Sequence, residues 1–159
     1  MRVLGIDVGF AILGWSIVEK SGTKYNLIDY GVIETSKDEK IETRLQQVYV
    51  NLNEVIKNYK PEVSAVESLF FFKNQKTIIN VGQVRGVILL ALVNNNLEIF
   101  DYTPLQVKVS VTGYGRAEKS QVQKMVKIIC GLNEIPKPDD AADAIAIGIC
   151  HLNTVKFNK

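Results

Sequence analysis

Four carboxylates interrupt stretches of the chain that are otherwise apolar. Asp7 ends the run of residues 3–6, Glu67 ends the run 63–66, and Asp140 and Asp143 open the alanine- and isoleucine-rich segment that follows them. A buried charge costs free energy unless another group compensates it. If the three segments converge, repulsion between the acids would demand protons or bound cations, and carboxylate oxygens suit Mg²⁺ or Mn²⁺. The pattern predicts a metal-dependent phosphoryl-transfer site.

The local sequence around these acids is compatible with ligands and with simpler roles. Asp140 and Asp143 are three residues apart, so both would point to one side of a helix and could hold one ion. The alternative is an ordinary helix start after Pro138, where acids favour the helix dipole. Gly5 and Gly9 flank Asp7 and would let a phosphate or metal approach the backbone, or they are turn residues only.

Cations lie in a glycine-bounded loop, residues 113–120. The loop is not a nucleotide-binding P-loop, because Glu118 stands where that motif has glycine before the lysine. Arg116 and Lys119 at the start of a helix could instead hold a DNA phosphate. The alternative is a solvated helix start.

Three consecutive phenylalanines, residues 70–72, follow Glu67 and precede Lys73 and Lys76. Strand alternation cannot bury all three rings on one face. Phe70 is predicted to be an exposed aromatic that stacks on bases beside the lysines, and Phe71 is included among the candidate DNA-binding residues, the sharing of this role by Phe71 or Phe72 being left open. The alternative places at least two of these rings in the core.

Composition predicts one soluble domain spanning residues 1–159, since 47% hydrophobic and 23% charged residues are ordinary values. The net charge is only +2, but four acids inside a metal site would leave a more basic surface, which suits nucleic acid. Cys130 and Cys150 are expected to be buried and reduced. We expect a cytoplasmic protein, because no signal peptide is evident and the longest apolar run, 87–93, is too short for a bilayer.

The periodicity predicts an α/β fold. An antiparallel meander of strands 2–8, 13–19 and 25–35 is followed by strands 63–67 and 97–101 and by helices 42–59, 77–93, 104–112, 118–130 and 139–153. The meander and the alternating elements together favour a mixed five-stranded sheet flanked by helices.

The helix 77–93 is apolar nearly all round from Val87 onward, and one domain covers only one face of a helix. Gly82 and Gly86 lie on one face and would permit close backbone approach. We therefore predict a symmetric dimer interface here that includes Gly82, Gly86 and Leu89. The alternative is a central core helix.

An ordered series of motifs resembles one known family. It comprises Gly5-Ile6-Asp7, Ala65-Val66-Glu67, Lys73-Asn74, Gly82-Gln83-Val84-Arg85-Gly86, Gln106-Val107-Lys108, the segment 117–123 and Asp140-Ala141-Ala142-Asp143-Ala144. The chain resembles the RuvC family of Holliday junction resolvases, members of the ribonuclease H-like superfamily, over nearly its whole length. Val8 and Phe10 depart from the family pattern, which usually has proline and a small polar residue there.

The resemblance implies a ribonuclease H-like fold and a homodimer that nicks opposing strands of four-way junction DNA, with RuvA and RuvB as partners. It implies that Asp7, Glu67, Asp140 and Asp143 bind two Mg²⁺ ions, with Mn²⁺ as a substitute, and that Lys108 and Lys119 are cationic site residues. In a two-metal hydrolysis, Lys119 would neutralise charge on the scissile phosphate. Two rival hypotheses are an actin-like or sugar-kinase-like phosphotransferase and a non-catalytic junction-binding module.

Overall fold

The structure is a computed structural model that describes residues 1–68 and 75–155, with the backbone alone at 75–77. Its elements, in chain order, are β1 (Arg2–Asp7), β2 (Ile12–Ser21), β3 (Lys24–Glu34), α1 (Ile41–Tyr59), β4 (Val63–Glu67), α2 (Gln75–Asn94), β5 (Glu98–Tyr102), α3 (Pro104–Thr112), α4 (Lys119–Ile129) and α5 (Asp139–Thr154). Every predicted element is present, and each end lies within two residues of its predicted position.

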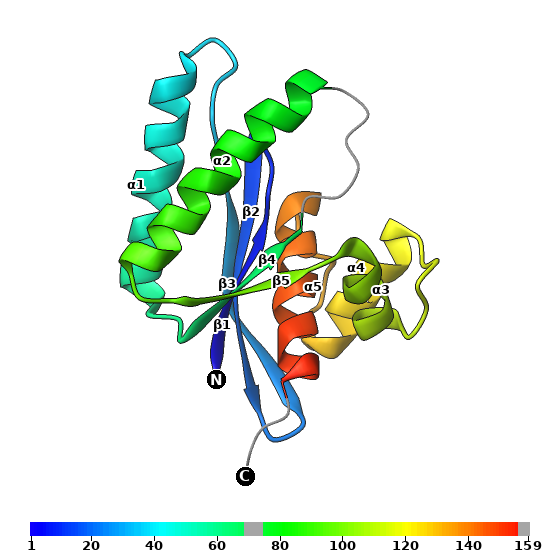
Figure 1. Cartoon of the computed structure of the whole chain (residues 1–159). Helices are drawn as coiled ribbons and strands as arrows, with labels where there is room; N and C mark the ends of the chain where they lie inside the picture. Colours follow the sequence, from blue (N-terminus) through cyan, green and yellow to red (C-terminus); the bar gives the residue numbers. More distant parts are fainter. Residues whose placement is uncertain (69–74, 156–159) are drawn as a thin grey trace.

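The strands form one mixed sheet in the order β3-β2-β1-β4-β5 (Figure 1). The first three strands pair antiparallel, whereas β4 pairs parallel with both β1 and β5. Gly22, with a φ of 58°, occupies the left-handed conformation that the tight β2–β3 turn requires. The predicted mixed five-stranded sheet with a meander and parallel strands is confirmed.

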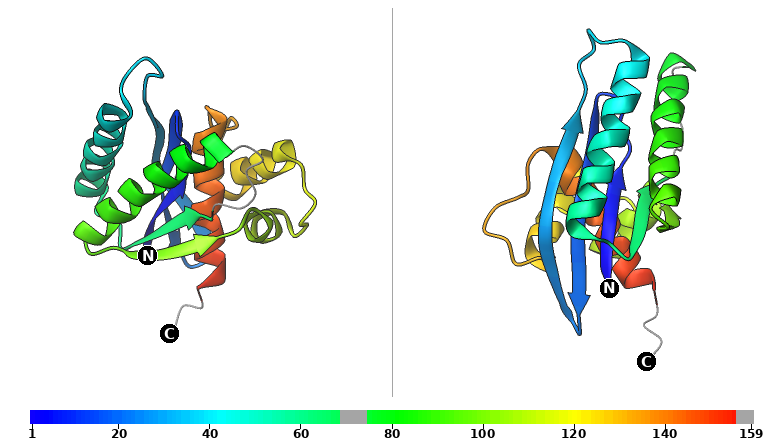
Figure 2. Two further views of the ribbon diagram at one scale, coloured as in Figure 1. Left: turned by 45° about the horizontal axis from the view of Figure 1, so that its top comes forward. Right: turned by 90° about the vertical axis from the view of Figure 1, so that its left-hand side faces the viewer.

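Helices cover both faces of the sheet (Figure 2). One face packs against α1 and α2, and the other packs against α5, which α3 and α4 enclose from outside. Strand alternation divides the core accordingly: Leu4, Ile6 and Val66 face the first pair of helices, while Val3 and Ala65 face α5. A side chain's position along a strand therefore determines which helices it meets.

Helix α5 is buried nearly all round, from Ala141 to Leu152, apart from Asp143. Its alanines, glycine and isoleucines suit this environment, because it lies between the sheet and two further helices. The one interruption, half-buried Asp143, lies near its amino-terminal end. This end of α5 becomes one wall of the site.

Candidate active site

Asp7 and Glu67 lie side by side at the carboxyl ends of neighbouring parallel strands. Ile6 of β1 pairs with Val66 of β4, so the next residue on each strand is an acid. Both acids occupy odd positions, the ones whose neighbours Val3 and Ala65 pack towards α5. The two carboxyl groups share a hydrogen bond. Strand register alone thus brings two acids, 60 residues apart in sequence, into contact.

Asp140 and Asp143 reach the same place because α5 packs unusually close to β1 and β2. A Cβ atom at Gly14 would lie 2.0 Å from the Asp140 carbonyl oxygen, and one at Gly5 would lie 2.2 Å from that of Ala144. The Ser16 hydroxyl donates a hydrogen bond to the Ala144 carbonyl at 2.9 Å. Small residues on two strands therefore hold the first turns of α5 beside the acids of the sheet.

This packing changes our interpretation of the glycines around Asp7. Gly5 was expected to admit a phosphate or metal to the backbone, but the helix backbone already fills that space. Gly9 is required for a different reason, since a Cβ there would lie 2.0 Å from the Ile12 carbonyl oxygen in the β1–β2 turn. The glycines position the acids instead of binding the ligand.

The acids interact strongly with one another. Burial, together with the charges of Glu67, Asp143 and Asp140, raises the pKa of Asp7 to about 8. Burial also raises the pKa of Glu67 and of Asp143, although Lys119 opposes both shifts. Such shifts mark a place where negative charge is crowded and where a cation would relieve the repulsion.

Lys119 is the cation that this arrangement supplies. Its Nζ lies 2.8 Å from Asp143 and 3.6 Å from Asp139, and 53% of its side chain is exposed. Burial acts to lower the pKa of Lys119, but the hydrogen bond and charge of Asp143, with Asp139 and Asp140, raise it. Lys119 is therefore charged and remains reachable from solvent.

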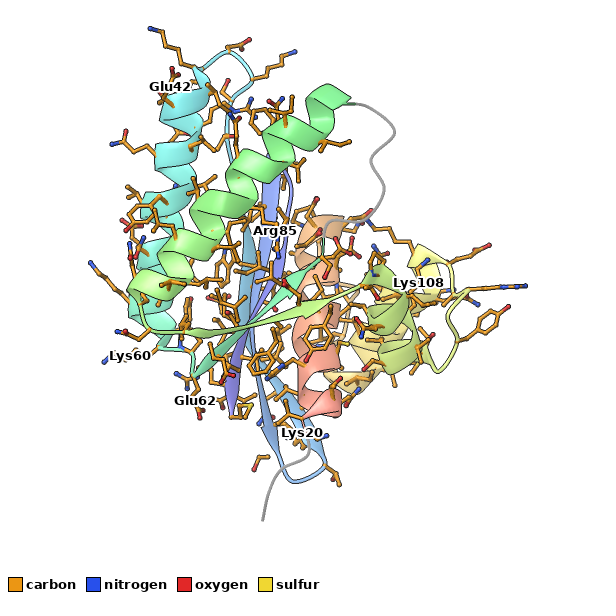
Figure 3. All side chains as sticks on the ribbon, viewed as in Figure 1. Lys20, Glu42, Lys60, Glu62, Arg85 and Lys108 are labelled. Carbon is orange, nitrogen blue, oxygen red and sulfur yellow. The ribbon has the colours of Figure 1, made fainter. Side chains whose placement is uncertain are left out.

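The middle of α3 and the start of α4 bring two lysines to one cavity beside these acids. Lys119 is the first residue of α4, whose start is fixed by reciprocal hydrogen bonds between Glu118 and Gln121. Lys108 lies on α3, on the side of the molecule where α4 packs (Figure 3). A cavity of about 250 Å³ is lined by both lysines, Glu67 and Asp143. Acidic and basic side chains thus line the same cavity.

The remaining predicted residues lie apart from this cavity or outside the described residues. Arg116 is exposed in the turn before α4. Phe70, Phe71 and Lys73 lie outside the described residues, as does the side chain of Lys76. On α2, Gly82 and Gly86 are exposed and Leu89 is half-buried.

The oxygen atoms of these acids are suited to a divalent cation in type, although they are not arranged as ligands. Among residues 1–68 and 75–155, no three Asp, Glu, His or Cys side chains are arranged as ready metal ligands. Asp7 instead shares its hydrogen bond with Glu67, and Asp143 pairs with Lys119. The chemistry nevertheless fits Mg²⁺ or Mn²⁺, because hard oxygens from three elements meet where burial, with repulsion between the acids, has raised the pKa of three of them.

Sequence reasoning missed two residues of this site. Asp139 was treated as part of a helix start, but it is a second partner of Lys119. Ser16 was not singled out, although it anchors α5 one residue after Asp143. The signal for Ser16 was present: Gly14 and Ser16 are small residues at alternate positions of a strand, which mark a face that a backbone approaches closely.

Comparison with known proteins identifies the family. The sequence model described as "Crossover junction endodeoxyribonuclease RuvC" matches residues 3–151. The chain belongs to the RuvC family. It is 57% identical to the protein of that name from Fusobacterium nucleatum, over 98% of this chain and 82% of the relative. It is also 57% identical to the Caldicellulosiruptor saccharolyticus protein, over 96% and 92% of the two chains. The predicted family is confirmed, and with it an endodeoxyribonuclease.

Solved structures agree with this assignment. Thermus thermophilus RuvC superposes with a TM-score of 0.88 and 35% identity, over 96% of this chain and 94% of that one. The T. thermophilus protein in complex with its Holliday junction substrate gives a TM-score of 0.89 at 33% identity, over the same shares of the two chains. The yeast mitochondrial resolvase Ydc2 shares the fold alone, with a TM-score of 0.69 at 14% identity. Separately, within the described residues no helix is long and apolar enough to cross a membrane.

Proposed function

We propose that this protein resolves four-way DNA junctions by nicking two opposing strands symmetrically, in a hydrolysis that depends on divalent metal. The observation that carries the proposal is the crowding of acids from β1, β4 and α5 beside Lys119. It occurs in a chain whose fold matches that of a RuvC protein bound to a Holliday junction. The family assignment favours a nuclease over an actin-like phosphotransferase.

Each polar group of the site has a distinct task in this proposal. Asp7, Glu67, Asp140 and Asp143 would together hold the two Mg²⁺ ions. When bound, the ions supply Lewis-acid activation of water and stabilisation of the leaving 3′-oxygen. Lys119 would move from Asp143 towards the scissile phosphate and neutralise its growing charge, because a partly exposed side chain can change partners.

The cationic side chains at the cavity would hold the DNA backbone. Lys108 lines the cavity together with Lys119, and Arg116 is exposed in the turn just before α4. Phosphates accept charge-assisted hydrogen bonds from such groups, which position the duplex without reading its sequence. We assign base contacts near the crossover to Phe70 and Phe71, with Lys73 and Lys76 on the neighbouring phosphates.

The exposed face of α2 supports a homodimer. Ile79 and Val93 are 62% and 60% exposed, and Leu90 between them is also exposed. A Cβ atom at Gly82 or Gly86 would meet no atom within 4 Å, so this face is open to a second backbone. Two copies joined here would place two active sites on one junction, as paired nicking requires.

We assign residues 1–159 to one nuclease domain that acts in the cytoplasm with RuvA and RuvB.

The proposal is tested with a synthetic mobile four-way junction and a linear duplex of the same sequence, each incubated with Mg²⁺ or with EDTA. We expect paired symmetric nicks on the junction only, and only with Mg²⁺. Equal cutting of both substrates would show a general nuclease. Junction binding without cutting, under both Mg²⁺ and Mn²⁺, would favour the non-catalytic binding module.

A further inference from the structure

A buried arginine lies behind the turn that follows Asp7. Arg44, in the first turn of α1, is only 6% exposed. This end of α1 lies at the same end of the sheet as the carboxyl end of β1, where Figure 3 labels the neighbouring Glu42. A long cationic side chain rarely occupies such a place without an acidic partner. Its contacts therefore indicate what it does.

None of the ion pairs among the described residues involves Arg44. Its Nη2 donates to the Phe10 carbonyl at 3.2 Å, and its Nε donates to the Thr35 hydroxyl at 2.9 Å. The guanidinium lies 3.7 Å from the centre of the Phe10 ring. Neutral groups of the β1–β2 turn and of the segment after β3 thus compensate the charge.

These contacts hold the β1–β2 turn from two sides. The Phe10 carbonyl also accepts a hydrogen bond from the Thr35 hydroxyl at 3.2 Å, and the Thr35 amide donates to the Ala11 carbonyl at 3.0 Å. Gly9 permits the tight approach of this turn to Ile12. Only Val8 and Gly9 separate Phe10 from Asp7. A movement of Phe10 would therefore act on Asp7 through a short stretch of backbone.

We propose that Arg44 is a positioning residue for the metal site: by fixing the Phe10 carbonyl it fixes the turn after Asp7 and so the direction of the Asp7 carboxylate. Arg44 touches neither metal nor DNA in this role. The departure of Phe10 from the family pattern fits it, because the ring supplies a flat face on which the guanidinium stacks. This inference rests on the metal-dependent function proposed above.

Metal binding by the DNA-free protein tests the role without using activity. Free Mn²⁺, measured by electron paramagnetic resonance during titration, gives the dissociation constant for Mn²⁺. For Arg44→Met we expect this constant to rise about tenfold, the low end of the effect of groups that orient metal ligands. The dissociation constant of Arg44→Lys should lie between those of Arg44→Met and wild type, since lysine can donate to the carbonyl but has no planar group to stack on the Phe10 ring.

Arg2→Met is the matched control. Arg2 is also a partly buried arginine that bonds a backbone carbonyl, but it lies at the opposite end of β1 and pairs with Glu19. We expect it to lower the melting temperature while leaving the Mn²⁺ constant unchanged. If Arg44→Met does not fold, Thr35→Val removes the hydroxyl that bonds both Arg44 and the Phe10 carbonyl, at nearly constant volume, and should also raise the dissociation constant for Mn²⁺.

The outcomes separate this inference from the function on which it rests. If wild type binds Mn²⁺ and cleaves junctions, but Arg44→Met lowers only the melting temperature, Arg44 is a packing residue and the inference is overturned. If wild type cleaves no junction with any metal, the proposed function fails first. A Mn²⁺ constant that rises for Arg44→Met and not for Arg2→Met supports the inference.

Discussion

At the scale of single residues, the site combines an excess of acids with a lysine, Lys119, that is paired to one of them. The ion pair of Lys119 with Asp143, at 2.8 Å, compensates part of the negative charge while the lysine remains half-exposed. If Lys119 transfers to the scissile phosphate, its loss should affect the chemical step more than DNA binding.

We therefore predict that Lys119→Met lowers the single-turnover cleavage rate about 10²-fold, the size expected for losing one stabilising donor. Lys124→Met is the control, because Lys124 is an exposed lysine of the same helix that makes no ion pair among the described residues. An equal loss of rate in both variants would show that only the general charge of α4 matters.

His151 gives a residue-scale prediction about stability. It is fully buried, its Nδ1 lies 2.9 Å from the Tyr102 hydroxyl, and its Nε2 has no partner among the described residues. In the folded state, burial lowers the pKa of His151 below the ordinary histidine value of 6.5. As the pH falls, the unfolded chain therefore takes up a proton on His151 before the folded chain does. The stability that comes from burying neutral His151 is complete above pH 6.5 and is lost as the pH falls below it.

The measurement is the difference in unfolding free energy between wild type and His151→Gln, with EDTA, from about pH 5 to about pH 8. Glutamine keeps an acceptor for Tyr102 but does not titrate. We expect wild type to lose stability relative to the variant below pH 6.5, by at most about 1.4 kcal/mol per pH unit. A constant difference across the range would mean that His151 does not titrate on unfolding.

At the scale of elements, the site depends on how closely α5 approaches the meander. A methyl group at Gly14 would lie 2.0 Å from the Asp140 carbonyl oxygen, where it cannot be accommodated without moving the helix. The first two turns of α5 carry Asp140 and Asp143, so this movement would separate them from Asp7 and Glu67.

Gly14→Ala should reduce cleavage about 10²-fold or more, since a displacement of about 1 Å has that effect on a catalytic constellation. Junction binding in EDTA should change little. Gly22→Asn is the control, because Gly22 lies in an open hairpin turn with a positive φ that asparagine tolerates. Full activity of Gly14→Ala would contradict this account of the helix position.

At the scale of the whole molecule, the open face of α2 determines whether two active sites act together. By light scattering, the double variant Leu90→Glu, Val93→Glu should have the 17.8 kDa mass of a monomer, whereas wild type should have the mass of a dimer, twice that value. Charge on an apolar interface is strongly unfavourable. Ile128→Glu, an equally exposed apolar residue on α4, should leave wild-type mass unchanged. A monomeric wild type would exclude this dimer.

The sequence was sufficient to predict the sheet, the helices and the four acids, because each is encoded in local periodicity or in a charge within an apolar run. It was insufficient for the contacts that place them. The contact of Gly14 with the backbone of Asp140 depends on which helix packs on which face of the sheet. The ion pair of Lys119 with Asp139, in addition to Asp143, depends on how α4 and α5 pack together. Arg44 gave no sequence signal, since an arginine near a helix start is normally solvated.

The most direct test of the central claim, that the four carboxylates form the metal-dependent catalytic site, is Asp7→Asn assayed on a four-way junction with Mg²⁺. Asparagine keeps the size of the side chain but cannot ionise to bind a cation, and Asp7 is the acid whose pKa is raised to about 8. We predict that cleavage is abolished while junction affinity in EDTA stays near that of wild type, because an Asp7 whose pKa is about 8 carries little charge near neutral pH when no metal is bound. Cleavage by Asp7→Asn at a rate near that of wild type would contradict the account.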